Sequence, residues 1–518
     1  MTTNSDFFKK RRAGVLLHIT SLPGTPGNGD LGKQAYYFVN FLKECGLSVW
    51  QTLPISPPHV LSAKKNYQDF LSPYQCQSAH AGNPLLISLE GLVDKGWLVD
   101  ADISESTRQL DAIQYRRDCL KKAYVVFSKC TDDKERPAYD KFIKTHKHWL
   151  DDYARFRALK DKNNHEPWWN WPPEHRDYSQ ALEEIREDEE LKKAIEQYRF
   201  EQFVFFSQWQ KLKNYAHEHG VYLFGDMPIF VAEDSVDVWA QGENFLLDET
   251  TGRAKFVAGA PPDYFSSKGQ CWGNPIYNWE HIQANGFQWW LERFRTLHQL
   301  FDSVRLSHFC GFQECYAIPN TNPIVNKDGH WIKDLPGEAL FTTLQDEQRK
   351  WDSPLSLVAE TVGMKDRKDV IALRDKFKFP GIRILQLGFD SGTLKYGKKD
   401  NPHSPHNIER HHVVYTGTHD NNTTLGWFQE LEPKIQREVC EYLRTDSKDM
   451  PWALIEKAFE TTASLVIIPM QDILGGDARQ RMNIPGTSEG NWRWRFDWGD
   501  LQPEAKKRLC RFVENFGR

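Results

Sequence analysis

The sequence lacks the features that define several common protein classes. No apolar run approaches the ~18 residues of a membrane-spanning helix. Basic residues form no long cluster, and the formal net charge of −5 at pH 7 disfavours a surface that neutralises nucleic-acid phosphates. Low-complexity tracts and internal repeats are also missing. A small-molecule partner is therefore expected, with no nucleic acid and no membrane.

Cysteine is present but is not spaced for metal binding or for a disulfide framework. The nine cysteines are an odd number, with no Cys-x-x-Cys pair and no His/Cys cluster at zinc spacing. Basic residues at 9–12 precede an apolar stretch, but His18 interrupts that stretch too early for a signal peptide. These absences predict a cytoplasmic protein with reduced thiols and no metal.

Length and aromatic residues are what the chain has in abundance. Its 518 residues suffice for one large decorated domain or for several smaller ones. Aromatic residues make up 13% of the sequence and include 19 tryptophans. Most such rings pack in cores, although the flat faces of sugars also stack on indole and phenol rings. Composition leaves both uses open.

Short apolar segments recur along the chain, with helical patterns between them. They span residues 14–18, 49–53, 221–228, 304–307, 357–360, 382–389, 413–416 and 465–470. Alternating strands and helices are typical of a parallel sheet, and eight strands suit a closed (β/α)8 barrel. The predicted fold class is therefore α/β, a TIM barrel.

Two helical segments have an apolar stripe suited to packing against such a barrel. The stripe of residues 33–45 consists of Tyr37, Phe38, Phe41 and Leu42, and that of residues 287–301 consists of Trp290, Phe294 and Leu297. Both segments are expected on the outside of the barrel.

The connection after the second strand is far longer than the usual roughly 2 to 6 residues. We therefore predict one decorated barrel over residues 1–518, with a mainly helical inserted subdomain over residues 60–210. Charged residues at helical spacing within 100–198 support the helical assignment. A second insertion, residues 230–283, is rich in Gly, Pro and aromatic residues, which is typical of long ordered loops. We expect it to line a binding groove.

Two of the predicted strands run directly into an acidic residue. Residues 357–359 lead to Glu360, and residues 413–416 lead into the GTHD segment that ends at Asp420. Active sites of (β/α)8 barrels lie at the C-terminal ends of the strands, so both acids are candidate functional residues. Taken alone, each could equally cap a helix or form a salt bridge in a loop.

Further motifs are spread over most of the chain. In order they are GVLLH (14–18), SLPG (21–24), GDLG (29–32), WQTLP (50–54), SPYQ (72–75), AGNP (81–84), GDMPIFV (225–231), PPDYF (261–265), GQCWGNP (269–275), PGT (485–487) and GNW (490–492). Together with the two segments that end in Glu360 and Asp420, they resemble glycoside hydrolase family 77, the amylomaltases or bacterial 4-α-glucanotransferases.

The resemblance implies disproportionation of maltodextrins without a cofactor. Members of this family cut an α-1,4-glucan, hold the glycosyl part on an Asp, and pass it to the 4-hydroxyl of another glucan. Such a retaining mechanism uses two carboxyl groups about 5 Å apart. Glu360 matches the acid/base, which needs a pKa raised toward neutrality, for example by burial. Asp420 matches the carboxylate that stabilises the transition state and is expected to stay ionised.

The nucleophile position departs from the family pattern. The family has RIDHFRGFE, whereas residues 305–313 are RLSHFCGFQ, with Ser307 in place of the Asp. A serine hydroxyl with no base beside it is a poor attacker of an acetal, and Asp302 is expected near the other end of the strand. Loss of a nucleophile costs about 10⁶ in rate in an unrelated hydrolase. Further departures from the pattern are Leu71, Cys310, Gln313 and Thr361.

The resemblance also assigns a substrate groove. In the family the equivalent of Arg305 steadies the nucleophile. Because Ser307 occupies the nucleophile position here, we expect Arg305 to face no anion. The substrate-binding residues implied are Tyr74, Asp263, Tyr264, Phe265, Gln270, Trp272, Arg305, His308, Phe389 and His419. Ordinary packing in loops is the alternative role for these side chains.

Three functions remain open from the sequence, and an α-1,4-glucan or maltooligosaccharide is the predicted ligand in each. The first is a working 4-α-glucanotransferase of carbohydrate metabolism, which the resemblance favours. The second is a catalytically inactive glucan-binding protein, acting as a sensor or as the partner of an enzyme, which the chemistry of Ser307 favours. The third is a weak inverting hydrolase, with a water in the space vacated beside Ser307.

Overall fold

The structure is a computed structural model that describes residues 6–24, 28–59, 72–103, 112–262, 266, 268–321, 329–362, 367–389, 401–487 and 489–518. Eight parallel strands close into a barrel at its centre. In order around the barrel they are β1 (Arg12–Leu16), β12 (Leu465–Pro469), β11 (His412–Tyr415), β10 (Gly381–Ile384), β9 (Ser356–Ala359), β6 (Ser303–Leu306), β3 (Tyr222–Met227) and β2 (Val49–Gln51). The predicted (β/α)8 class is confirmed.

Burial on both faces explains why these strands are nearly continuous apolar runs. Val413 and Val414 of β11 point to opposite faces, and both are fully buried. Strand β10 is shorter than predicted, because Leu385–Phe389 turns into a 3-10 helix. The apolar stretch after the basic residues 9–12 forms β1. Only glycine fits at position 14 of this strand, because a Cβ there would lie 2.2 Å from the carbonyl oxygen of Val49.

Both helices predicted outside the barrel are present. In α10 (Gln288–Leu300), the stripe of Trp290, Phe294 and Leu297 is buried as predicted. In α1 (Lys33–Glu44), Phe38, Phe41 and Leu42 are buried, but Tyr37 is 55% exposed, so its assignment to the stripe is wrong. With about 100° between neighbouring residues of a helix, Tyr37 lies just beyond the face that Phe38, Phe41 and Leu42 share. The ring of Tyr37 instead packs edge-on against Trp498.

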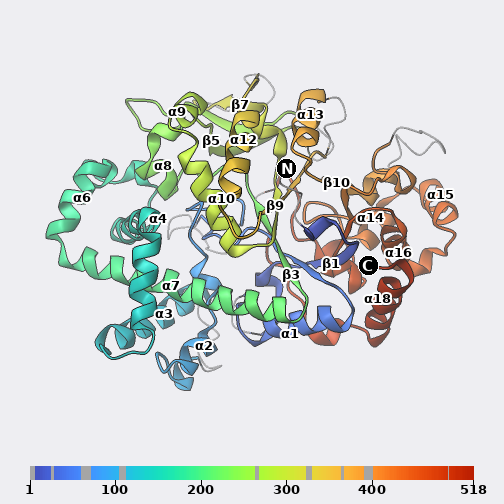
Figure 1. The fold of residues 1–518 in the computed structure, drawn as a ribbon, viewed down its shortest axis with the longest axis horizontal. Helices are drawn as coiled ribbons and strands as arrows, with labels where there is room; N and C mark the ends of the chain where they lie inside the picture. Colours follow the sequence, from blue (N-terminus) through green and yellow to red (C-terminus); the bar gives the residue numbers. More distant parts are fainter. Residues whose placement is uncertain are drawn as a thin grey trace.

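Helices fill the long connection between β2 and β3. They are α2 (Leu89–Asp94), α3 (Ala112–Lys129), α4 (Arg136–Lys162), α5 (Pro173–Arg176), α6 (Tyr178–Glu187) and α7 (Glu189–Glu218). Helices α4 and α7 pack along each other, and Figure 1 shows the group to one side of the barrel. The boundaries of the inserted subdomain, residues 60–210, stay a prediction.

The second insertion contains more regular structure than the expected ordered loops. Strands β4 (Phe256–Ala260) and β5 (Gln270–Pro275) join β7 (Cys315–Pro319) and β8 (His330–Ile332) in an antiparallel sheet of order β5-β4-β7-β8. Gly and Pro in these segments suggested loops, yet Gly259 is what lets β5 approach, since a Cβ there would lie 2.3 Å from the carbonyl oxygen of Gln270.

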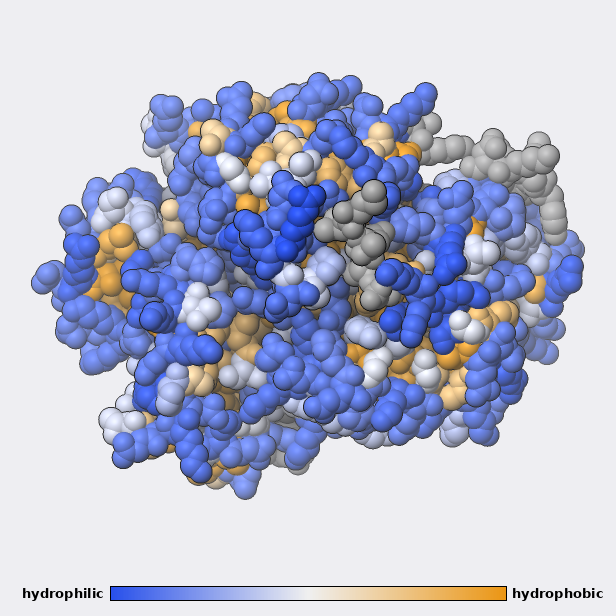
Figure 2. Space-filling view, in the orientation of Figure 1, coloured by the Kyte–Doolittle hydropathy of each residue, from blue (hydrophilic) through white to orange (hydrophobic). Residues whose placement is uncertain are grey.

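The remaining helices complete the outer layer. They are α8 (Val236–Ala240), α9 (Trp279–Ala284), α12 (Gly337–Gln348), α13 (Lys368–Lys376), α14 (Thr424–Glu430), α15 (Pro433–Leu443), α16 (Trp452–Glu460), α17 (Met470–Ile473) and α18 (Pro503–Phe516). The face in Figure 2 is mainly hydrophilic, with small apolar areas between the polar ones. Among the described helices, none combines the length and apolarity that a membrane crossing requires.

Candidate active site

The candidate residues gather at the C-terminal mouth of the barrel. Ser307 directly follows β6, Glu360 directly follows β9, and Asp420 lies in the loop after β11. Strand β3 contributes Asp226, which stands opposite Arg305 in the register between β3 and β6. Because the strands are parallel, their carboxyl ends meet at one rim, where such barrels hold their active sites.

Arg305 joins two carboxylates at this rim. Its Nη2 donates to Oε1 of Glu360 at 2.5 Å, and its Nη1 donates to Oδ2 of Asp226. The side chains of Arg305 and Asp226 are 4% and 0% exposed, and that of Glu360 is 20% exposed. The expectation that Arg305 faces no anion is therefore wrong, because its guanidinium pairs with acids from the two neighbouring strands.

These contacts set the charge of Glu360. Burial raises the pKa of Glu360, but the charge of Arg305 and a hydrogen bond from the backbone N–H of His308 to Oε2 at 2.7 Å outweigh it, so that its pKa is lowered. His308 has a left-handed backbone, with φ of 52°. The raised pKa expected of an acid/base is thus not present in this arrangement, and Glu360 is ionised at neutral pH.

Ser307 has one hydrogen-bond partner for its hydroxyl within the described ranges. Its Oγ lies 3.5 Å from Oε2 of Glu360, at the long limit of a hydrogen bond. Glu360 is thus the only group positioned as a base, and its lowered pKa makes it a weak one. Asp302 lies at the other end of β6, as expected, where it accepts from the backbone N–H of Leu223 at 2.7 Å.

Tyr74 connects the two sides of the mouth. Its hydroxyl donates to Oδ2 of Asp226 at 2.7 Å, and its ring stacks on His419 with the centroids 5.1 Å apart. Nε2 of His419 lies 3.2 Å from Oδ2 of Asp420. A continuous series of contacts therefore runs from Glu360 through Arg305, Asp226, Tyr74 and His419 to Asp420, which places both predicted acids in one site.

Asp420 is held as an anion. Burial raises the pKa of Asp420, but His419 and a hydrogen bond from Nδ2 of Asn483 to Oδ1 at 2.7 Å prevail, and its pKa lies well below the usual range. The expectation that Asp420 stays ionised agrees with this geometry. Burial has the opposite net effect on Asp226, whose pKa is raised despite Arg305.

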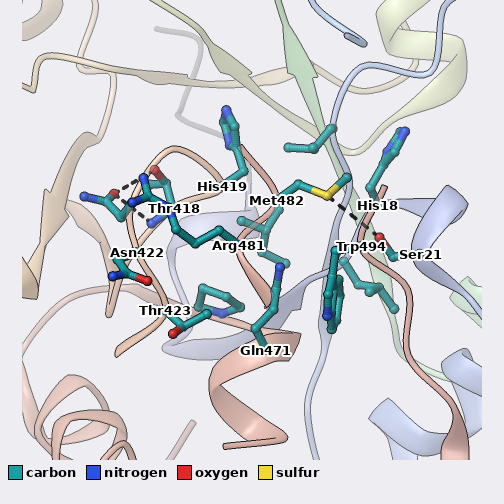
Figure 3. A pocket seen from close by; sticks show the side chains of 15 residues that line it. His18, Ser21, Thr418, His419, Asn422, Thr423, Gln471, Arg481, Met482 and Trp494 are labelled. Carbon is teal, nitrogen blue, oxygen red and sulfur yellow. Dashed lines mark hydrogen bonds between the residues drawn. The ribbon is translucent and has the colours of Figure 1, made fainter. Parts of the chain in front are cut away.

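Beside His419, the ends of β1, β11 and β12 enclose a small cavity of about 20 Å³ (Figure 3). Its wall includes His18, Thr418, Asn422, Gln471, Arg481, Met482 and Trp494. Burial and the nearby His419 lower the pKa of His18 to about 3, so its imidazole is neutral. This volume holds about one water molecule, so the cavity is not itself a glucan groove.

Aromatic rings frame the mouth. Trp272, on β5, meets His308 edge to face with the centroids 4.7 Å apart, and its Nε1 donates to Oε1 of Gln270 at 3.1 Å. Trp492 lies 5.8 Å from Tyr74 and 6.0 Å from His419, measured between ring centroids. The side chains of Trp272 and Trp492 are both half-buried, which leaves part of each indole accessible to a ligand.

The other predicted residues are buried or lie outside the described part of the chain. Phe389 is 1% exposed and packs against Trp427 and Tyr442, and a contact between its ring and a sugar stays a prediction. Two residues at departures from the family pattern, Cys310 and Thr361, are buried. Asp263, Tyr264, Phe265 and Leu71 lie outside the described residues.

Sequence reasoning did not select Asp226, Asn483 or Trp492 as site residues. Asp226 offered a usable signal, since it is an acid near the C-terminal end of an apolar strand, as Glu360 is. Asn483 and Trp492 lie in a loop that follows the last barrel strand, and no local pattern predicts that this loop folds back over Asp420. Nowhere in the described ranges do three His, Cys, Asp or Glu side chains come together as metal ligands.

Comparisons with known proteins agree with this geometry. The family model described as 4-alpha-glucanotransferase matches residues 17–501. The 4-alpha-glucanotransferase of Synechocystis sp. is 40% identical over 518 residues, covering 98% of each chain, and that of Thermus thermophilus is 40% identical over 516 residues, covering 97% of this chain and 98% of the other. The amylomaltase of Streptococcus agalactiae, solved in complex with acarbose, superposes with a TM-score of 0.88 at 33% identity, covering 98% of this chain and 100% of that one. The chain belongs to the 4-alpha-glucanotransferase family.

Proposed function

We propose that the protein binds α-1,4-glucans at the barrel mouth and transfers them as a 4-α-glucanotransferase about 10⁶ more slowly than a member with the nucleophilic carboxylate. One observation carries this proposal. The contacts from Glu360 through Arg305 to Asp420 form a single charged site, and the residue at its nucleophile position is Ser307. We also propose a cytoplasmic location, which the nine free cysteines support.

In this proposal each retained residue keeps the role that the family motif assigns to it. Glu360 acts as the acid/base, and Asp420 accepts hydrogen bonds from sugar hydroxyls, which its ionised state favours. Trp272 and Trp492 offer faces on which sugar rings stack. The S. agalactiae amylomaltase, solved in complex with acarbose, supports a saccharide ligand for this chain.

The slow rate follows from two features of the same site. Ser307 is uncharged and has no strong base beside it, so the covalent glycosyl intermediate on which a retaining mechanism depends forms only very slowly and does not accumulate. Glu360 is ionised by its pairing with Arg305 and must gain a proton before it can act as an acid. A factor of 10⁶ corresponds to about 8 kcal/mol of barrier. These features also favour a second candidate function, a glucan-binding sensor without turnover.

Incubation with maltotriose, together with calorimetric titration of a longer maltooligosaccharide, tests the proposal. We expect binding at one site, and glucose plus longer maltodextrins formed about 10⁶ more slowly than by an aspartate-bearing relative. Asp420→Asn should weaken binding, whereas Asp477→Asn, at a surface ion pair with Arg479, should leave it unchanged.

The products and the titration distinguish the alternatives. Binding without any longer maltodextrin would establish the sensor. Release of the β-anomer would establish the inverting hydrolase, since only that mechanism inverts the anomeric centre. Absence of binding would refute the proposal, and turnover at the rate of an aspartate-bearing relative would refute the role given to Ser307.

A further inference from the structure

A larger cavity lies in the helical insertion, separate from the barrel mouth. Its volume is about 240 Å³, several times the ~30 Å³ that a water molecule occupies in the liquid. Helices α3, α4 and α7 line it together with the loop residues 57–58 and 83–85. None of its lining residues belongs to the candidate active site. The cavity is therefore large enough for a small organic molecule and independent of the glucan site.

One wall of this cavity is cationic. Arg117 and Lys121 lie one turn apart on α3, and Arg157 reaches the cavity from α4. Arg157 is only 7% exposed and donates from Nη1 to Oε1 of Gln77, while its Nε has no hydrogen-bond partner within the described residues. Gln77 is uncharged, so the guanidinium of Arg157 keeps its positive charge at this wall.

The carboxylates that line the cavity do not cancel this charge. Asp161 accepts a hydrogen bond from the hydroxyl of Tyr198 and lies 3.3 Å from Nδ1 of His165. Glu201 is 4% exposed and accepts from Nε2 of Gln197 at 2.8 Å. Burial raises the pKa of Glu201 to about 7, so this carboxyl is only partly ionised at neutral pH. Three cations thus face two carboxyl groups, of which Glu201 is only partly ionised, and this imbalance favours an anionic ligand.

The rest of the wall combines apolar and amide groups. Its apolar members are Pro57, Pro58, Pro84, Leu85 and Leu120, and its amide side chains are Asn83, Gln114 and Gln197. Amides pair with hydroxyl groups, and proline rings pack against C–H faces, which together match a monosaccharide. We propose that this cavity binds a phosphate-bearing small molecule, a phosphorylated monosaccharide, with its phosphate against Arg117, Lys121 and Arg157.

Calorimetric titration of the full-length protein with glucose 6-phosphate, inorganic phosphate and glucose tests this assignment. We expect glucose 6-phosphate to bind once per chain. The double variant Arg117→Ala/Lys121→Ala should weaken that binding by about tenfold or more, because it removes two charge-assisted contacts to the phosphate. Lys129→Ala, at an exposed position on the same helix, is the matched control and should bind as the wild type does.

The arms of the experiment separate the sources of the anion. Tighter binding of glucose 6-phosphate than of inorganic phosphate supports a sugar phosphate, and equal binding that the double variant weakens supports recognition of free phosphate by the same cations. Saturating maltotriose should change neither affinity. The assignment is overturned if neither anion binds, if glucose binds as well as its phosphate, or if a folded double variant binds as tightly as the wild type.

Discussion

Ser307→Asp is expected to raise the rate of maltotriose disproportionation at least about 10³-fold, out of the about 10⁶ that a nucleophile contributes. Position 307 follows β6 directly, and its side chain already lies beside Oε2 of Glu360. A carboxylate there would complete the pair that a retaining mechanism requires. Cys310 and Thr361, which are buried and also differ from the family pattern, are expected to keep the rate below that of an aspartate-bearing relative. Full recovery of the rate is therefore not predicted.

The same substitution should change the pH dependence. A carboxylate near Oε2 raises the pKa of Glu360 by like-charge repulsion and competes for Arg305, which now lowers that pKa. Glu360 must be protonated to act as an acid, and the rate falls as pH rises through its pKa. The alkaline limb of kcat/KM for Ser307→Asp should therefore lie at higher pH than that of the residual wild-type activity.

Ser307→Asn is the matched control, because it has nearly the shape of the aspartate without its charge. It should stay at the wild-type rate. A gain in both variants would show that shape rather than charge limits turnover. If a folded Ser307→Asp variant gains nothing, the neighbouring departures from the family pattern have also dismantled the site, and the account of Ser307 as the single limiting residue fails.

Asp226→Ala is expected to lower the free energy of unfolding by about 3–5 kcal/mol, because it leaves Arg305 buried with one of its two partners removed. The side chains of Asp226 and Arg305 are 0% and 4% exposed, so water cannot replace the lost carboxylate. The hydroxyl of Tyr74 loses its acceptor at the same time. Urea denaturation measures the effect as a lower midpoint at an unchanged slope.

A surface pair of the same chemistry provides the comparison for this prediction. Asp477 and Arg479 also form an Asp–Arg contact, but Arg479 is 89% exposed. Solvent screens such pairs, so Arg479→Ala, which keeps the helix cap formed by Asp477, should leave the urea midpoint unchanged. Equal midpoints for the two variants would contradict the claim that the buried contacts from Arg305 to Asp226 hold the barrel mouth together.

The barrel could be predicted from sequence because its strands are buried on both faces. Strands buried on both faces need continuous apolar segments, such as residues 413–416 and 465–470. The number of these segments and their alternation with helices indicate the closed sheet. The helical insertion could also be predicted, because its charged residues recur at helical spacing. The small antiparallel sheet could not be predicted, because Gly259 and the glycine and proline of β5 resemble the residues of a loop.

The charge pattern of the site could not be predicted from sequence, because it depends on which strands are neighbours. Arg305 stands beside Asp226 in register and beside the strand that ends in Glu360, although 79 and 55 positions separate them along the chain. Glu360 and Asp420 were recognisable as acids at strand ends. Phe389 was assigned to the groove from the resemblance, and its packing against Tyr442 could not be read from the local sequence.

The central claim is that the Glu360–Asp420 site has no carboxylate able to attack the anomeric carbon. Intact-mass spectrometry of protein quenched during reaction with a maltosyl fluoride donor tests it most directly. The wild type should carry no covalently attached glycosyl group at any time, and Ser307→Asp should carry one. A glycosyl group on the wild-type protein, mapped to Asp226 or to any other acid, would contradict the account.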